Sequence, residues 1–128
     1  MQHSTRKPTI YEAERIEAML RLGCCACAIL EIWHPAECHH MTMPGKRYGH
    51  WWTLPLCSGH HRGDWNYLQT KLIPKDKRVA LSDGTKAWER VYPSQRVLFE
   101  RVQMKLGLSA AWPTSKILPR RTEGLCSS

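Results

Sequence analysis

The chain has 128 residues, which is enough for one domain with a modest hydrophobic core. Its formal net charge of +8 favours a polyanionic partner, and nucleic acid is the simplest candidate. No apolar run approaches the roughly 18 residues that a membrane span needs, and the N-terminal stretch lacks the apolar core of a signal peptide. We therefore expect a cytoplasmic protein with no membrane partner, in which reduced cysteines bind metal rather than form disulfides.

The first predicted element is a helix over residues 10–22. Thr9 and Glu12 have the spacing of a capping box at its start, and Gly23 suits the position after its end. Apolar residues recur between them at helical spacing. Residues 1–8 are polar and basic, so we expect them to form a tail. The stretch after the helix, CCACAILEIW (24–33), predicts a cysteine-bearing turn that leads into a strand.

The central part of the sequence predicts short strands separated by a loop. Residues 41–50 contain proline and glycine and are expected to form that loop. Residues 51–57 (WWTLPLC) predict a short strand, which Pro55 restricts to a sheet edge or to an early end. A helix is expected from Ser58 to about Leu68, although Gly59 and Gly63 weaken it.

The C-terminal part predicts helices. Residues 71–84 are expected to form a basic loop or a hairpin, and a helix should follow over about 85–91. Pro93 interrupts that helix, Ser94 can cap another one, and Gly107 ends it. Residues 108–128 have little pattern and are expected to form a flexible tail. The sequence therefore predicts one α+β domain over residues 9–107.

Two cysteine-bearing turns have the spacing of a zinc site. Cys24 and Cys27 form a C-x2-C pair, and Cys57 and His60 form a C-x2-H pair. Each pair can close a tight turn, and together the two turns supply the ligands of a tetrahedral structural zinc ion. The competing interpretation is that the cysteines are small buried core residues. Cys25 is an alternative to Cys24, although a C-x-C pair closes the turn less well.

Three further histidines lie close to this pattern. His39 and His40 are adjacent on an expected strand, so they should face opposite sides and have different roles. His61 follows His60, and a zinc site would hold it rigidly near the strand. The alternative for His39 and His40 is a pair of ordinary surface residues on a strand.

The chain carries four motifs that together cover most of residues 10–106: LGCCAC, ECHHM, GHWWTLPLCSGHHRG and TKAWERVYPSQRVLFERV. In this order they resemble the HNH (His-Me finger) endonucleases and, more narrowly, the Ref-like family of phage recombination-enhancement, RecA-dependent nucleases. The resemblance implies a small zinc-stapled ββα-metal finger flanked by an N-terminal helix and C-terminal helices. It also implies a metal-dependent endonuclease that cleaves DNA, with a RecA filament as a partner on recombination intermediates.

The resemblance assigns roles to individual residues. The positions that match the structural zinc ligands are Cys24, Cys27, Cys57 and His60. His40 matches the general base that deprotonates a water molecule, a role that suits an imidazole of near-neutral pKa. His39 and His61 match ligands of a catalytic divalent cation, Mg²⁺ or another, which stabilises the transition state and the leaving 3′ oxygen.

Two positions depart from the family pattern. Family members usually carry a further metal-binding histidine where this chain has Leu81, whose side chain cannot bind a metal. Asp64 is a candidate replacement if it lies on the same helix as His61. His50 stands where relatives often have aspartate, and it is either another metal ligand or a tolerated loop residue. The departures leave open a catalytically degenerate zinc-containing module that binds DNA or another protein of a phage recombination system.

Basic and aromatic residues near the histidines are candidates for DNA contacts. Lys46 and Arg47 lie in the expected loop, and Arg62 follows His61, so these side chains can bind phosphates. The tryptophans that can stack on bases of single-stranded DNA are Trp51, Trp52 and Trp65. The competing interpretation of the tryptophans is core packing around the zinc.

Overall fold

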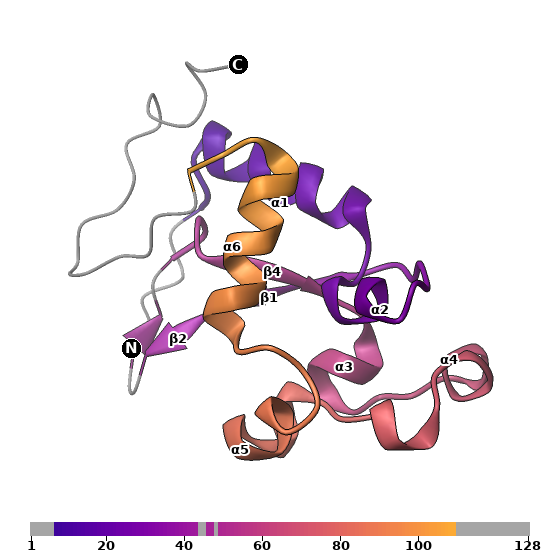
Figure 1. Cartoon of the computed structure of the whole chain (residues 1–128). Coiled ribbons are helices and arrows are strands. Elements are labelled where there is room, and N and C mark those ends of the chain that lie inside the picture. The colour runs from indigo at the N-terminus through magenta and orange to yellow at the C-terminus, as the bar shows by residue number, and fades with distance from the viewer. Residues whose placement is uncertain (1–6, 44–45, 48, 110–128) are drawn as a thin grey trace.

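The computed structural model describes residues 7–43, 46–47 and 49–109, and it has the α+β architecture predicted from the sequence (Figure 1). Its elements are α1 (Ile10–Leu22), α2 (Cys25–Ile29), β1 (Glu37–His40), β2 (Thr42–Met43), β3 (Lys46–Arg47), β4 (Thr53–Leu56), α3 (Ser58–Arg62), α4 (Tyr67–Leu72), η2 (Lys75–Lys77), η3 (Leu81–Asp83), α5 (Thr85–Glu89) and α6 (Gln95–Leu106). The elements η2 and η3 are short 3₁₀ helices. Within the described ranges, no helix has the length and apolar character needed to cross a membrane.

The central sheet pairs β1 with β4 in antiparallel orientation. His39 lies opposite Leu54, and His40 lies opposite Thr53. Every residue of β4 is buried, whereas β1 is half-buried throughout. Within the described residues each of these two strands pairs on one side only, so Pro55 occupies the edge position that its missing N–H requires. In Figure 1, α6 crosses this strand pair, and α3, α4 and α5 gather at one end of the molecule.

The long helices begin and end where the sequence predicted. The Thr9 hydroxyl accepts the backbone N–H of Glu12, and the Glu12 carboxylate accepts the backbone N–H of Thr9, which completes the capping box of α1. Gly23 follows α1 with a φ of 81°, where a β-carbon would lie 2.8 Å from the carbonyl oxygen of His34. Ser94 caps α6, and Gly107 ends it in the left-handed region.

The segment after the first cysteines differs from the prediction. Residues 25–29 form the short helix α2, not a turn that leads into a strand. The physical reason is a cap at the helix start, because the Cys24 sulfur accepts the backbone N–H of Cys27 at 3.4 Å. Residues 41–50 were expected to be a loop, but they contain the β2–β3 strand pair, in which Thr42 lies opposite Arg47.

The segment after the second cysteine-bearing turn also differs. The helix predicted from Ser58 to about Leu68 ends at Arg62, because Gly63 takes a left-handed φ of 76°. A separate helix, α4, then begins with its own capping box. Residues 71–84 contain the end of α4 and two 3₁₀ helices, so the hairpin alternative for this segment was wrong.

A buried arginine ties the layers of the fold together. Arg15 on α1 is 3% exposed, and its Nε donates to Oε1 of Gln103 on α6 at 2.7 Å. Its Nη1 donates to Oγ1 of Thr53 on β4, also at 2.7 Å. Burial lowers the pKa of Arg15 to about 10. Both α1 and α6 pack on β4 in this way. The two helices therefore hold in place the sheet that carries the histidines.

Candidate metal centre and histidine cluster

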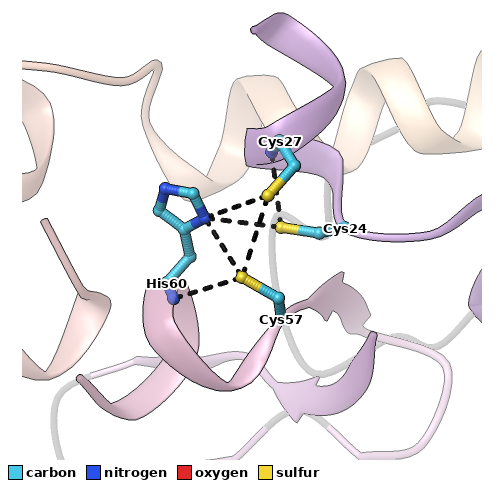
Figure 2. A group of neighbouring side chains, drawn as sticks. All are labelled: Cys24, Cys27, Cys57 and His60. Carbon is cyan, nitrogen blue, oxygen red and sulfur yellow. Dashed lines mark hydrogen bonds between the residues drawn. The ribbon is translucent and has the colours of Figure 1, made fainter. Parts of the chain in front are cut away.

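The predicted zinc ligands come together at one buried point between α2, β4 and α3, as Figure 2 shows: Cys24, Cys27, Cys57 and His60. Their ligand atoms all lie within 4.8 Å of one another. Nδ1 of His60 lies 3.3 Å from the sulfur of Cys57, 3.5 Å from that of Cys27 and 3.6 Å from that of Cys24. Cys24 and Cys57 each cap the short helix that carries their partner, so the spacing of each pair reflects a helical turn.

The hydrogen-bond partners of His60 indicate which of its two ring nitrogens carries the hydrogen. The Tyr92 hydroxyl donates to the carbonyl oxygen of Lys77 at 2.6 Å, so its oxygen can accept the Nε2–H of His60 at 2.8 Å. A neutral imidazole with its proton on Nε2 presents an unprotonated Nδ1, which is what a metal ligand requires.

The thiols themselves also favour a bound cation. The pKa of the Cys27 thiol is raised, chiefly by its hydrogen bonds with Cys24 and Cys57 and then by burial, because the crowded thiols cannot all ionise alone. A divalent cation would compensate the negative charge of the thiolates and so allow the crowded thiols to ionise together. Three sulfurs and one imidazole nitrogen form a set that suits Zn²⁺ in structural sites. These residues can therefore hold a structural zinc ion, and Cys25 does not belong to the set.

Two residues that sequence analysis missed support this cluster. His34 is 4% exposed, and its Nδ1 lies 3.3 Å from the sulfur of Cys27. Its carbonyl oxygen accepts the backbone N–H of Cys24 at 2.9 Å. Tyr92 is the second residue, through its contact with His60. Neither shows a ligand-like spacing in the sequence, and only the folded chain brings them to the cluster.

The predicted cation ligands His39 and His61 form a half-buried pair between β1 and α3. Their ring centroids are 5.1 Å apart. Nε2 of His39 lies 2.9 Å from Oε1 of Gln95 at the start of α6. Nδ1 of His61 lies 2.8 Å from Oε1 of Glu37 on β1. The sequence assigned no role to Gln95 or Glu37, because their roles depend on tertiary contacts.

Asp64 does not lie on the helix that its predicted role required. The helix α3 ends at Arg62, and Oδ2 of Asp64 lies 3.4 Å from Nη1 of that arginine. Across the described parts of the chain, the Cys₃His set is the only group of three or more histidine, cysteine or acidic ligands that converges. Leu81, at the position where the resemblance led us to expect a further histidine, packs against the hydrophobic core.

His40 occupies the last position of β1, next to His39 but on the other face of the strand. Its Nε2 lies 3.0 Å from Nδ1 of His50, and the two ring centroids are 5.1 Å apart. The two neighbouring histidines therefore contact different residues, Gln95 for His39 and His50 for His40. His50 lies directly beside His40.

The predicted phosphate-binding residues lie on two different elements, Arg62 at the end of α3 and Lys46 and Arg47 on β3. Arg62 donates to both carboxylate oxygens of Glu37, at 2.9 and 2.5 Å, and remains half exposed. These hydrogen bonds lower the pKa of the Glu37 carboxyl, with Arg62 as the largest cause. Lys46 and Arg47 form β3, but their side chains lie outside the described part of the structure.

The tryptophans serve the core rather than an open surface. Trp51 and Trp52 are only 7% and 2% exposed, which leaves little of either ring for stacking on a base. Trp65 packs edge-to-face on His60, with ring centroids 5.1 Å apart. A β-carbon on Gly59 would lie only 2.1 Å from the Trp65 ring, so this packing depends on the glycine. The core-packing interpretation therefore holds for these residues.

Comparison with known proteins places the chain in a family. A family model described as "Recombination enhancement, RecA-dependent nuclease" matches residues 8–106. The match runs from just before α1 to the end of α6. It includes the Cys₃His cluster, the pair of His39 and His61, and the pair of His40 and His50. A comparison with curated proteins finds no match. Because the family model covers most of its length, the chain belongs to the recombination enhancement, RecA-dependent nuclease family.

Proposed function

We propose that the protein is a metal-dependent DNA endonuclease of the HNH type that acts on recombination intermediates coated with RecA. Membership of the family supports nuclease activity and the involvement of RecA. The observation that carries the HNH assignment is the arrangement of histidines beside the Cys₃His cluster. His39 pairs with His61 across β1 and α3, while His40 takes the next position of the same strand.

The Cys₃His cluster has a structural role in this proposal. Zinc bound there would join α2 to α3, and each of these helices has only five residues. Isolated helices of that length are not stable in water, so they depend on such a junction. The free energy of zinc binding is then also folding free energy.

The pair His39 and His61 is proposed to hold the catalytic cation. When bound, a divalent cation stabilises the negative charge that develops on the phosphate and on the leaving oxygen. Two imidazoles suit Mn²⁺ and similar first-row ions better than Mg²⁺, which prefers oxygen ligands. Asp64 can add an oxygen ligand only if its carboxylate leaves Arg62.

His40 is proposed to act as the general base. Its imidazole takes a proton from a water molecule, and the water oxygen forms a bond to phosphorus. The bond from phosphorus to the 3′ oxygen breaks, and that oxygen takes a proton from solvent. The products are a 5′ phosphate and a 3′ hydroxyl. Lys46, Arg47 and Arg62 are proposed to contact neighbouring phosphates, and these contacts would position the DNA backbone without reading its sequence.

Cleavage assays with the zinc-loaded full chain test the proposal. The substrates are single-stranded DNA and supercoiled plasmid, each with and without RecA and ATP, in Mn²⁺, in Mg²⁺ and without added cation. We expect cleavage that requires an added cation and increases with RecA. Salt-sensitive DNA binding without cleavage under any condition would instead support the degenerate DNA-binding module. Absence of both would support a protein-interaction module.

A further inference from the structure

Glu37 connects the first position of β1 to the end of α3. Its Oε1 lies 2.8 Å from Nδ1 of His61 and 2.9 Å from Nε of Arg62, and its Oε2 lies 2.5 Å from Nη2 of Arg62. His61 and Arg62 are consecutive residues at the end of α3. One carboxylate therefore holds both side chains in a defined orientation relative to the strand.

The chemistry of this contact fixes the tautomer of His61. An ionised carboxylate can only accept hydrogen bonds, so Nδ1 of His61 must carry the hydrogen. The ion pair with Arg62 favours the ionised form of the carboxylate. In the neutral imidazole, a hydrogen on Nδ1 leaves Nε2 with an unshared electron pair, which is the form that binds a metal ion.

We propose that Glu37 is a positioning residue for the catalytic cation, because it holds His61 with Nε2 available to the cation while Arg62 holds Glu37. The inference rests on the proposed function, since it requires His61 to be a cation ligand. Arg62 then has two roles, because it holds Glu37 in place in addition to contacting phosphates. Carboxylates that orient a metal-binding histidine typically raise metal affinity or activity by about 10- to 100-fold.

The contact is too exposed to matter greatly for the fold. The side chains of Glu37 and Arg62 are 34% and 54% exposed, and ion pairs of that kind stabilise proteins little. Removal of the carboxylate should therefore change the cation site much more than the thermal stability. This difference separates a positioning role from a purely structural one.

The test uses zinc-loaded full-length chain and two measurements. Long-range ¹H–¹⁵N correlation spectra report the tautomer of His61, and electron paramagnetic resonance reports the affinity for Mn²⁺. Wild type should show the Nδ1–H tautomer. Glu37→Ala should shift His61 toward the Nε2–H tautomer and weaken Mn²⁺ binding by about 10- to 100-fold. Arg62→Met should keep the Nδ1–H tautomer, because the carboxylate remains, while binding Mn²⁺ with intermediate affinity.

Two control variants make the outcomes distinct. Glu17→Ala removes the same charge from an exposed position of α1 and should match wild type in both measurements. His61→Ala should lose Mn²⁺ binding. If His61→Ala loses it while Glu37→Ala keeps both the tautomer and the affinity, the inference is wrong and the proposed cation site stands. If wild type and His61→Ala bind Mn²⁺ equally, or neither binds it, the proposed cation site fails and the inference fails with it.

Discussion

Nε2 of His40 lies 3.0 Å from Nδ1 of His50, so the proposed general base contacts a histidine whose role the sequence left open. A third group that orients a catalytic base is a recurrent feature of enzyme sites. The position of His50 beside the base is the arrangement that an orienting role requires.

This relationship predicts the effect of changing His50. We expect His50→Ala to lower the cleavage rate by about 10- to 100-fold, because the imidazole of His40 loses a partner that orients it. Zinc content and thermal stability should not change. His50→Asp should keep more activity, since a carboxylate can accept the N–H of His40. Single-turnover cleavage of RecA-coated DNA measures the effect, and wild-type rates in His50→Ala would rule out the orienting role.

The identity of the first zinc-binding cysteine, Cys24 or Cys25, gives a second prediction. Cys24 belongs to the Cys₃His cluster, whereas the Cys25 thiol lies outside it and has a pKa raised by burial. Cys24→Ser should therefore lose most of its zinc, and Cys25→Ser should retain it. Metal analysis of the two purified variants gives the answer. Retention of zinc in Cys24→Ser together with its loss in Cys25→Ser would show that the pair is C-x-C.

Tyr92 provides a third prediction, on the lifetime of the zinc complex. Its hydroxyl lies 2.8 Å from Nε2 of His60 and can accept the hydrogen of that nitrogen, so Tyr92→Phe removes a partner that orients a zinc ligand. We expect zinc to dissociate about 10- to 100-fold faster, as measured with an excess of a coloured chelator. Tyr67→Phe is the matched control, because that side chain is exposed on α4. Equal rates for Tyr92→Phe and wild type would exclude the orienting contact.

The buried arginine gives a fourth prediction, on stability. Thr53→Val removes an acceptor of the Arg15 guanidinium without opening a large cavity. Hydrogen bonds to buried charged groups are worth more than neutral ones, so the free energy of unfolding should fall by about 1–3 kcal/mol. Thr53→Ser keeps the hydroxyl and should lose less. Denaturant titration of the zinc-loaded variants measures the differences, and an unchanged Thr53→Val would mean that Arg15 finds another acceptor.

Local signals in the sequence predicted the parts of the fold that depend on local physics. The caps Thr9, Gly23, Ser94 and Gly107 set the ends of α1 and α6 because each satisfies backbone groups within a few residues. The metal cluster was predicted for a similar reason. One helical turn brings Cys24 to Cys27 and Cys57 to His60, so the spacing of each pair is a local signal.

The missed features depend on contacts between distant segments. The end of α3 at Gly63 removed the helical argument for Asp64, because a glycine can either continue a helix or take a left-handed conformation. Glu37 and Tyr92 act through side chains of other elements, so no spacing in the sequence could reveal them. Trp51 and Trp52 were both candidates for stacking on bases, yet both are buried in the turn before β4.

The central claim is that the cysteine cluster holds the fold while His40 performs the chemistry. Its most direct test compares wild type and His40→Ala for zinc content, melting temperature and cation-dependent cleavage of RecA-coated DNA. The claim predicts unchanged zinc and melting temperature, with cleavage reduced by at least about 100-fold, as expected for the loss of a general base. Full cleavage by His40→Ala, or the loss of its zinc, would contradict it.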